Sequence, residues 1–199
     1  MVKEFNILIA GVGGQGVILM SELLGDAAIR DGLNVRGSEV LGMAVRGGPV
    51  VSMIRLGDEV YGPLIPAGKG DILVGMEPAE ALRNIGYMSE SSLIILNTQA
   101  LVPYTVFIGE SSYPDLEEVT GILKRNSGEL VKLNATQIAE EAGSLLTTNI
   151  AMLGALFSSG KLPIKVETIK ESIQDRFSGE AALLDLKVFD LGYQAYKQA

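Results

Sequence analysis

The sequence predicts an α/β protein with three layers, α/β/α, in which helices cover both faces of a mostly parallel sheet that includes a short hairpin. Three observations support this class. Short apolar runs alternate with helical stretches, the first run ends in a glycine-rich loop, and the last third of the chain shows helical periodicity only. At 199 residues, with no linker or internal repeat, the chain fits one domain over residues 1–199.

Apolar and β-branched runs predict the strands. The run Phe5–Ala10 ends abruptly at a glycine, which is typical of a strand buried on both faces of a parallel sheet. Residues 57–59, Gly-Asp-Glu, predict a hairpin turn into Val60-Tyr61. The remaining strands are predicted at Val35–Val40, Val50–Leu56, Asp71–Met76, Ser92–Leu96 and Glu129–Leu133.

Apolar residues at spacings of three and four predict the helices. The first begins at Val17, after the glycine-rich loop, and closes near Gly32. The segment Thr147–Leu156 is apolar nearly all round, so its helix is buried either in the core or against another subunit. The other helices are predicted at Pro78 to about Asn84, Asp115–Arg125, Ala135–Ala142, along the stripe Val166, Ile169, Ile173 and Phe177, and from about Glu180 to Tyr196.

The composition excludes several kinds of chemistry. The chain has no Cys, His or Trp, which rules out disulfides, Cys-ligated iron–sulfur clusters, thiolate zinc sites and His- or Cys-based catalysis within it. A net charge of −8 without any run of five like charges argues against a nucleic-acid partner. Because there is neither a bilayer-length apolar stretch nor a signal-peptide pattern, we expect no membrane partner and a cytoplasmic location.

The clearest motif is the glycine-rich loop between the first strand and the first helix. It reads Gly11-Val12-Gly13-Gly14-Gln15-Gly16 and fits G-x-G-x-x-G in the context that this motif requires. Glycine allows positive φ and close approach of a phosphate, and the helix N-terminus supplies free N–H groups. We therefore expect Gly11, Gly13, Gly14, Gln15 and Gly16 to bind an anion or nucleotide. The alternative is a tight turn whose glycines serve packing alone.

A second glycine-rich loop follows the second strand. Arg46-Gly47-Gly48 places a guanidinium beside two residues without side chains, which suits contact with a phosphate, a carboxylate or a partner subunit. The alternative is a surface loop whose Arg pairs with a nearby carboxylate. Glu39 lies where a dinucleotide fold holds the ribose, about 20 residues beyond the glycine loop, so NAD binding stays open. The long excursion at 41–49, where a βαβ unit would have its second helix, counts against it.

Polar residues follow two of the predicted parallel strands. Glu77 and Asn97 stand at carboxyl ends, where open α/β sheets bind ligands, so both are candidates for one crevice. The alternative is that Glu77 and Asn97 only cap a helix or form a turn of the chain. Arg55 lies inside a strand-like run, so it either leaves the sheet edge or is paired within it, because an unpaired buried Arg costs too much.

Together these segments resemble the γ subunit of the 2-oxoacid:ferredoxin oxidoreductases, and a Glu-Pro…Glu-Ala-Leu-Arg segment looks most like the small (β) subunit of indolepyruvate:ferredoxin oxidoreductases. The resemblance spans most of the chain. It is carried by Gly11–Val17, by Ser38–Val40 through Met43-Ala44 to Arg46–Ser52 with Arg55, and by Tyr61–Pro66, Glu77–Arg83 and Asn149–Ala155.

The resemblance implies oxidative decarboxylation of a 2-oxoacid, an aryl pyruvate such as indolepyruvate, to its acyl-CoA, with electrons passed to ferredoxin. It places thiamine diphosphate and the iron–sulfur clusters in a large partner subunit, so this Rossmann-like chain would hold no redox cofactor alone and would at most help to form the coenzyme A region. Two positions depart from the family pattern: Val45 replaces a Gln or small residue, and Met53 replaces a His. Free-standing nucleotide binding and a ligand-free scaffold remain the competing hypotheses.

Overall fold

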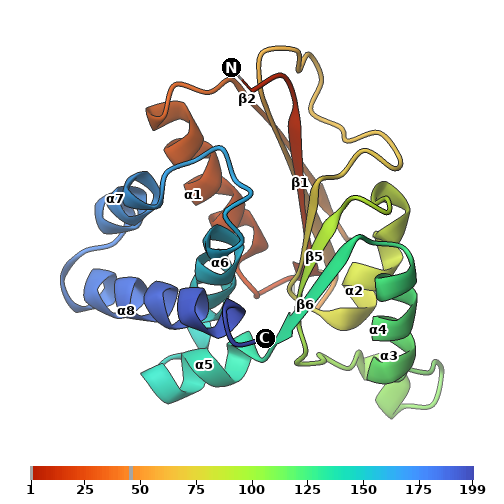
Figure 1. Cartoon of the computed structure of the whole chain (residues 1–199). Helices are drawn as coiled ribbons and strands as arrows, with labels where there is room; N and C mark the ends of the chain where they lie inside the picture. The colour runs from red at the N-terminus through yellow and green to blue at the C-terminus, as the bar shows by residue number, and fades with distance from the viewer. Residues whose placement is uncertain (1, 45–46) are drawn as a thin grey trace.

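A six-stranded mixed sheet forms the middle layer of the protein (Figure 1). The computed structural model describes residues 2–44 and 47–199. The strand order is β2-β3-β1-β4-β5-β6, in which β1, β4, β5 and β6 run parallel while β3 is antiparallel to both β1 and β2. The strands are β1 (Phe5–Val12), β2 (Val35–Leu41), β3 (Pro49–Leu56), β4 (Ile72–Gly75), β5 (Leu93–Asn97) and β6 (Glu129–Leu133).

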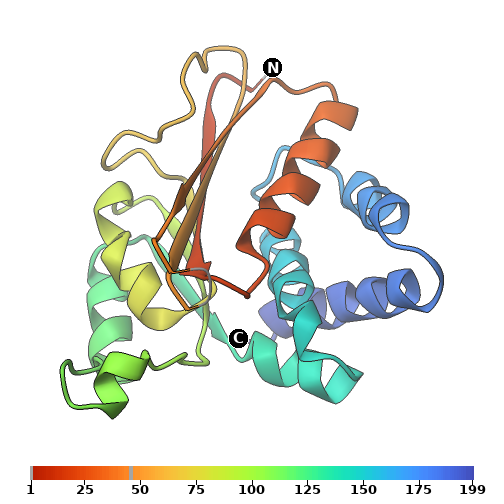
Figure 2. The same cartoon turned by 180° about the vertical axis from the view of Figure 1, so that it is seen from behind.

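Helices cover both faces of this sheet, which confirms the predicted three-layer class (Figures 1 and 2). One face carries α1 (Val17–Arg30), α5 (Ala135–Ala142), α6 (Thr148–Ser158), α7 (Val166–Arg176) and α8 (Gly179–Tyr196). The other carries α2 (Pro78–Arg83), α3 (Tyr104–Phe107) and α4 (Leu116–Arg125). Two 3₁₀ turns, at Ile85–Tyr87 and Leu145–Thr147, complete the described elements.

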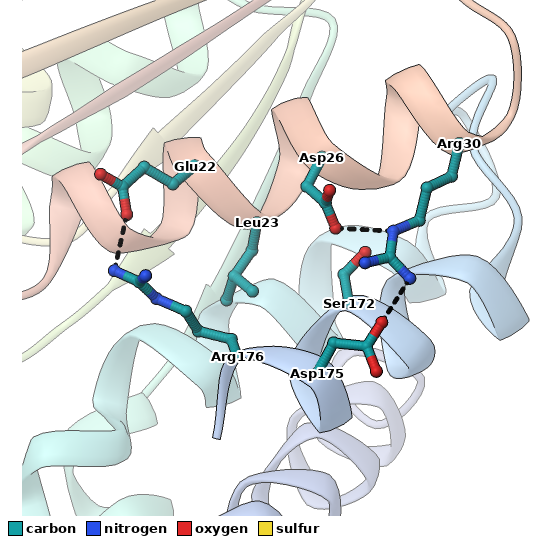
Figure 3. A pocket seen from close by; sticks show the side chains of 7 residues that line it. All are labelled: Glu22, Leu23, Asp26, Arg30, Ser172, Asp175 and Arg176. Atoms are coloured by element: carbon teal, nitrogen blue, oxygen red, sulfur yellow. Dashed lines mark hydrogen bonds and ion pairs between the residues drawn. The ribbon is translucent and has the colours of Figure 1, made fainter. Parts of the chain in front are cut away.

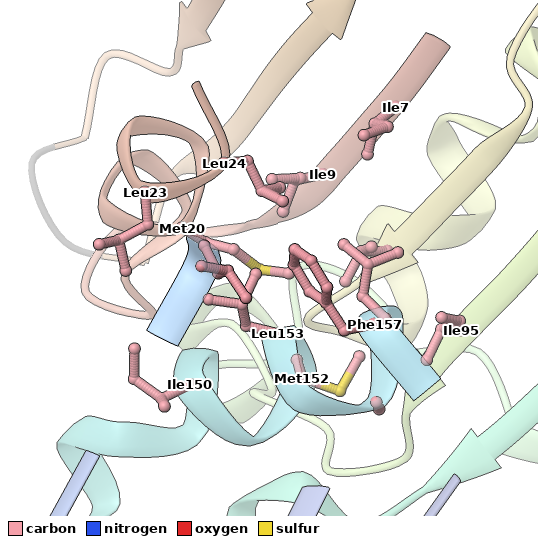
Figure 4. Close-up of a cluster of buried hydrophobic side chains, with 14 of the residues drawn as sticks. Ile7, Ile9, Met20, Leu23, Leu24, Ile95, Ile150, Met152, Leu153 and Phe157 are labelled. Carbon is pink, nitrogen blue, oxygen red and sulfur yellow. The ribbon is translucent and has the colours of Figure 1, made fainter. Parts of the chain in front are cut away.

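Alternating side chains of the central strands build two separate cores. On β1, Ile7 and Ile9 face the large core beneath α1 and α6 (Figure 4). Leu8 and Ala10 face the smaller core beneath α2 and α4. Both sets are fully buried. This explains why β1 reads as a continuous apolar run, since a strand covered on both faces has no polar side.

The apolar helix predicted at Thr147–Leu156 is α6, and it lies in the core of this chain. Its backbone contacts that of α8, because a Cβ on Gly154 would lie 2.0 Å from the Phe189 carbonyl oxygen, and one on Gly192 would lie 1.9 Å from the Ala151 carbonyl oxygen. The small residues therefore serve a close helix crossing. The core interpretation is confirmed.

The hairpin is found at a different place from the one predicted. Residues 57–59 do turn, but Val60-Tyr61 is not a strand. The N–H groups of Asp58 and Glu59 donate to the carbonyls of Val2 and Lys3, so the turn packs on the N-terminal segment instead of starting a new strand. The actual hairpin is β2–β3, joined through residues 42–48.

Arg55 is paired inside the sheet, which was one of the two predicted outcomes. Its Nε donates to Asn6 Oδ1 at 2.9 Å, and Nη2 contacts Glu4 Oε1 at 2.7 Å. Nη1 donates to the carbonyls of Gly62 and Leu64 at 2.8 and 3.0 Å. Every guanidinium nitrogen thus has a partner, and the side chain holds the 57–71 loop against the amino end of β1.

Candidate functional site

The glycine loop connects the carboxyl end of β1 to the start of α1. Gly14 and Gly16 have φ of 101° and 74°, a region that disfavours side chains, and Gly16 is the N-cap of α1. The N–H groups of Gly13 and Gln15 donate to Gly48 and Val12 carbonyls. Among the described residues, neither the Gly14 nor the Gly16 N–H has an acceptor. The loop therefore offers two backbone donors at a helix N-terminus, as anion binding requires.

The structure brings the two glycine-rich loops together. Gly13 donates its N–H to the Gly48 carbonyl at 2.9 Å, and the Gly47 N–H donates to the Gly13 carbonyl at 3.3 Å. Residues 47 and 48 thus lie directly beside the β1–α1 turn. Val45 and Arg46 lie outside the described residues, so the predicted contacts of Arg46 remain a prediction.

Two side-chain amides, that of half-buried Gln15 and that of buried Asn97, tie this edge of the sheet together through one carbonyl. Gln15 accepts from the Val12 N–H at 2.9 Å and donates to the Met76 carbonyl at 3.0 Å. Asn97, fully buried, donates to the same Met76 oxygen at 3.1 Å and accepts from the Ala135 N–H at 3.0 Å. The two amides link the ends of β1, β4 and β5 to the start of α5. In this geometry Gln15 and Asn97 position the loop.

Glu77 joins a different part of the molecule. It is the N-cap of α2, accepting from the Glu80 N–H at 3.0 Å, and its other oxygen accepts from the Leu101 N–H at 3.3 Å and from the Tyr113 hydroxyl. Burial, together with the hydrogen bond to Glu77, raises the pKa of Tyr113 above its ordinary value. Glu77 therefore fastens the 98–113 segment to α2, the capping function that was the alternative in the sequence.

Two hollows flank the glycine loop and share Gly13 and Gly14 as a common wall. The first, about 580 Å³, lies toward the β2–β3 connection and is lined mainly by Val12, Val17, Ile18, Leu41, Met43, Ala44 and Val50. The second, about 340 Å³, lies toward α5 and α6 and is lined by Gln15, Gln99, Leu101, Thr136, Leu145, Leu146 and Thr148. This arrangement can hold an anionic group at the loop with apolar groups on both sides.

Some of these lining residues were not identified from the sequence. Thr136 and the pair Leu145-Leu146 were overlooked, and Thr148 was assigned only to the core helix. A signal existed for the threonines, since both stand in the first turn of a predicted helix that begins at the same edge of the sheet. Nothing local marks the leucines as exposed.

A third hollow, about 390 Å³, lies between α1 and α7 and has a different character (Figure 3). Its charged groups are paired with one another: Arg176 contacts Glu22 at 3.0 Å, and Arg30 contacts Asp26 at 2.8 Å and Asp175 at 2.7 Å. The pairs Arg176–Glu22 and Arg30–Asp175 join the two helices, and with Arg30–Asp26 inside α1 they leave none of these charges for a ligand. Such surface pairs contribute about 0–1 kcal/mol each.

The topology of the sheet argues against the hypothesis that this chain binds NAD through Glu39. Glu39 is exposed on the edge strand β2, and β3 separates β2 from β1. With about 4.8 Å between neighbouring strands, Glu39 lies roughly 10 Å across the sheet from the strand that carries the glycine loop. In a dinucleotide fold the acidic strand is the direct neighbour of that strand.

Met53, one of the two departures from the family pattern, is a core residue. It is buried on β3, and its sulfur accepts from the Ile65 N–H at 3.4 Å. The side chain therefore anchors the 57–70 loop. The other departure, Val45, falls outside the described residues.

Comparisons with known proteins agree with this architecture. The family model described as pyruvate ferredoxin/flavodoxin oxidoreductase matches residues 6–195. Indolepyruvate oxidoreductase subunit IorB of Pyrococcus horikoshii is 41% identical over 98% of both chains. Pyruvate oxidoreductase subunit PORC of Thermotoga maritima has a TM-score of 0.68 at 25% identity, over 97% of both chains.

A larger structure contains the same fold as one part of its chain. The 2-oxoglutarate:ferredoxin oxidoreductase of Magnetococcus marinus aligns with a TM-score of 0.77 at 22% identity. The alignment covers all of this chain but 32% of that one. Because the family model and the relatives cover nearly the whole sequence, this chain belongs to the pyruvate ferredoxin/flavodoxin oxidoreductase family.

Proposed function

We propose that this chain is the small subunit of a 2-oxoacid:ferredoxin oxidoreductase that acts on indolepyruvate or a related aryl pyruvate. The reaction would release CO₂ from the 2-oxoacid, transfer the acyl group to coenzyme A and pass two electrons to ferredoxin. The observation that carries the proposal is the 41% identity to an indolepyruvate oxidoreductase subunit over 98% of both chains. The topology, with β1 between antiparallel β3 and parallel β4, fits the same assignment better than free-standing NAD binding does.

The redox cofactors fit a partner subunit better than this chain. Iron–sulfur clusters need thiolate or imidazole ligands, and the sequence has neither Cys nor His. Within residues 2–44 and 47–199, no three acidic side chains gather as a metal site would require. We therefore assign thiamine diphosphate and the clusters to a large subunit, through which ferredoxin would be reduced.

The glycine loop is the part of this chain that fits a phosphate-bearing ligand, for which we propose coenzyme A. When bound, coenzyme A supplies the thiol that receives the acyl group. The Gly14 and Gly16 N–H groups would donate to a phosphate, and the space over Gly14 is open, since a Cβ there would meet nothing within 4 Å. Gln15 and Asn97 would hold the loop in the donor geometry.

The remaining proposed contacts stand around this loop. Gly11 allows close packing under it, because a Cβ there would lie 2.7 Å from Gln15 Oε1 and 2.8 Å from Met76 Cβ. Gly47 and Gly48 are hydrogen-bonded to Gly13 of the loop. Arg46 would add a charge-assisted hydrogen bond to the phosphate. Glu77 would act indirectly, by fixing the 98–113 segment that carries Leu101 to one of the hollows.

Reconstitution tests the proposal. Oxidation of indolepyruvate with coenzyme A and a viologen acceptor is measured for this chain alone, for the large subunit alone, and for both together. We expect turnover with both, and a higher kcat/KM for indolepyruvate than for pyruvate or 2-oxoglutarate. Turnover by this chain alone, or micromolar NAD(H) binding that Glu39→Ala abolishes, would contradict the assignment.

The phosphate contact has its own test in the reconstituted complex. Arg46→Ala removes one charge-assisted hydrogen bond, worth about 1.5–3 kcal/mol, and should raise the KM for coenzyme A by about 10-fold or more. Arg36→Ala is the matched control, because Arg36 is exposed on β2 and its Nη1 donates to the neighbouring Val35 carbonyl. Equal KM values for the two variants would remove Arg46 from the site.

A further inference from the structure

The edge of the sheet that carries the glycine loop differs in charge from the rest of the protein. One residue in five of the chain is charged, yet none of the described residues lining the two hollows beside the loop is. The hollow between α1 and α7 is lined mostly by charged side chains, and the hollow near Arg55 also contains Glu4, Lys69 and Asp71. Among the described residues, a lining without charged side chains is thus particular to these two hollows.

Exposed apolar side chains stand around the same loop. Leu146 is 86% exposed, Leu41 59% and Leu145 54%, and Met43 is fully exposed. They come from segments far apart in the sequence, but the shared wall of Gly13 and Gly14 shows that these segments converge. Single exposed apolar residues are ordinary, whereas a contiguous group marks an interaction surface. We call Leu41, Met43, Leu101, Leu145 and Leu146, with Gly13 and Gly14, the glycine-loop face.

Short helix α3 extends this apolar character at the same end of the molecule. In Figures 1 and 2, α3 and α5 both lie at the end where the parallel strands finish. Tyr104 and Phe107 of α3 are each 74% exposed, and no charged residue occurs between Glu90 and Glu110. Glu77 accepts hydrogen bonds from the Leu101 N–H and the Tyr113 hydroxyl, on either side of α3, so the segment that carries these two rings is anchored at both ends.

We propose that the glycine-loop face is the surface on which the large subunit docks, with apolar side chains of that subunit filling the two hollows. The proposal rests on the proposed function for the identity of the partner. Docking here would also close the hollows over the Gly14 and Gly16 N–H groups, so the same contact that holds the subunits together would exclude water from the loop.

Electrostatics favour a different protein over a second copy of this chain. Helices α1 and α6 both begin at this face, so it carries the positive ends of two helix dipoles and the unfilled donors of Gly14 and Gly16. A symmetric dimer would set these ends and donors against their own images. A large subunit can instead present apolar side chains to the exposed leucines and Met43 around the loop, which leaves the Gly14 and Gly16 donors to the phosphate proposed for them.

Charge substitutions on exposed positions test the docking face without disturbing the core. The test variants, Leu146→Glu and Met43→Glu, each place a carboxylate on the glycine-loop face. The matched controls lie elsewhere on the surface: Leu183→Glu on α8, at a position 70% exposed, and Ile29→Glu on α1, at a position 66% exposed. Affinity for the isolated large subunit is measured by biolayer interferometry, and folding by circular dichroism. We expect both face variants to weaken association by about 30-fold or more, the effect of one lost hot spot, and both controls to bind like wild type.

Other results separate the failure of this inference from that of the proposed function. Face variants that bind normally while a control variant loses affinity would move the interface elsewhere and overturn the docking face alone. An isolated chain that is dimeric by light scattering, and that Leu146→Glu makes monomeric, would identify a second copy as the occupant and overturn it as well. A wild-type chain with no affinity for the large subunit would overturn the proposed function itself.

Discussion

Asn97 is the side chain on which we expect the geometry of the site to depend most. Replacing it with Ala removes the buried hydrogen bonds to the Met76 carbonyl at 3.1 Å and from the Ala135 N–H at 3.0 Å, and a part-buried one to Thr136 Oγ1 at 3.0 Å. At about 1 kcal/mol per hydrogen bond, the free energy of unfolding should fall by about 3 kcal/mol. For a chain of this size that corresponds to a Tm lower by roughly 6–12 °C.

The assay is urea unfolding together with calorimetric melting, with Asn134→Ala as the matched control. Asn134 caps the same helix, α5, but through one hydrogen bond to the Gln137 N–H at 3.0 Å, so its loss should cost about 1 kcal/mol. If Asn97→Ala costs no more than Asn134→Ala, Asn97 does not tie the strand ends together. Asn97→Asp should be destabilised at neutral pH and recover as the pH falls, since its buried carboxyl must be protonated to donate to Met76.

Two further predictions concern stability away from the site. Gly154→Ala should lower the free energy of unfolding by about 1–3 kcal/mol, because its Cβ would lie 2.0 Å from a backbone oxygen of α8. The control is Gly25→Ala, in open space on α1, which should raise the free energy of unfolding by up to about 1 kcal/mol. Equal effects of the two substitutions in urea titrations would contradict the close crossing of α6 and α8. Hydrogen bonds from Asn6 and Arg55 hold the pKa of Glu4 below its usual range. The stabilisation by Glu4 is therefore complete above about pH 4.5 and is lost as the pH falls through the lowered pKa. In thermal melts between about pH 3 and 6, the difference in Tm between wild type and Glu4→Gln should therefore shrink as the pH falls. A difference in Tm that stays constant with pH would refute this linkage.

The parts of the fold that depend on neighbours in sequence could be predicted. The apolar run of β1, the glycine loop and the stripe of α1 follow each other directly, so residue pattern and spacing define the whole unit. The prediction of a hairpin at residues 57–59 was wrong because this turn depends on residues that are distant in sequence. Its turn residues are genuine, but their N–H groups bond to Val2 and Lys3, more than fifty residues earlier, and no local pattern contains that pairing.

In the candidate site too, features set by the local sequence could be predicted, whereas those set by distant residues could not. The glycine loop was predicted, whereas the inward direction of Gln15 depends on the carbonyl of Met76, 61 residues away. Asn97 could be placed at a strand end from the sequence, but its positioning function needs the neighbouring start of α5. The exposure of Leu146 also depends on tertiary structure, because an apolar residue beside a core helix is ordinarily read as buried.

Hydrogen–deuterium exchange of this chain, free and in complex with the large subunit, tests the central claim most directly. If the chain completes a site in its partner through the glycine-loop face, the amides of residues 13–17 and 145–148 should become protected on association, while those of the exposed side of α7, residues 166–176, should exchange as in the free chain. Protection confined to α7 and α8, with the loop amides unchanged, would contradict the account.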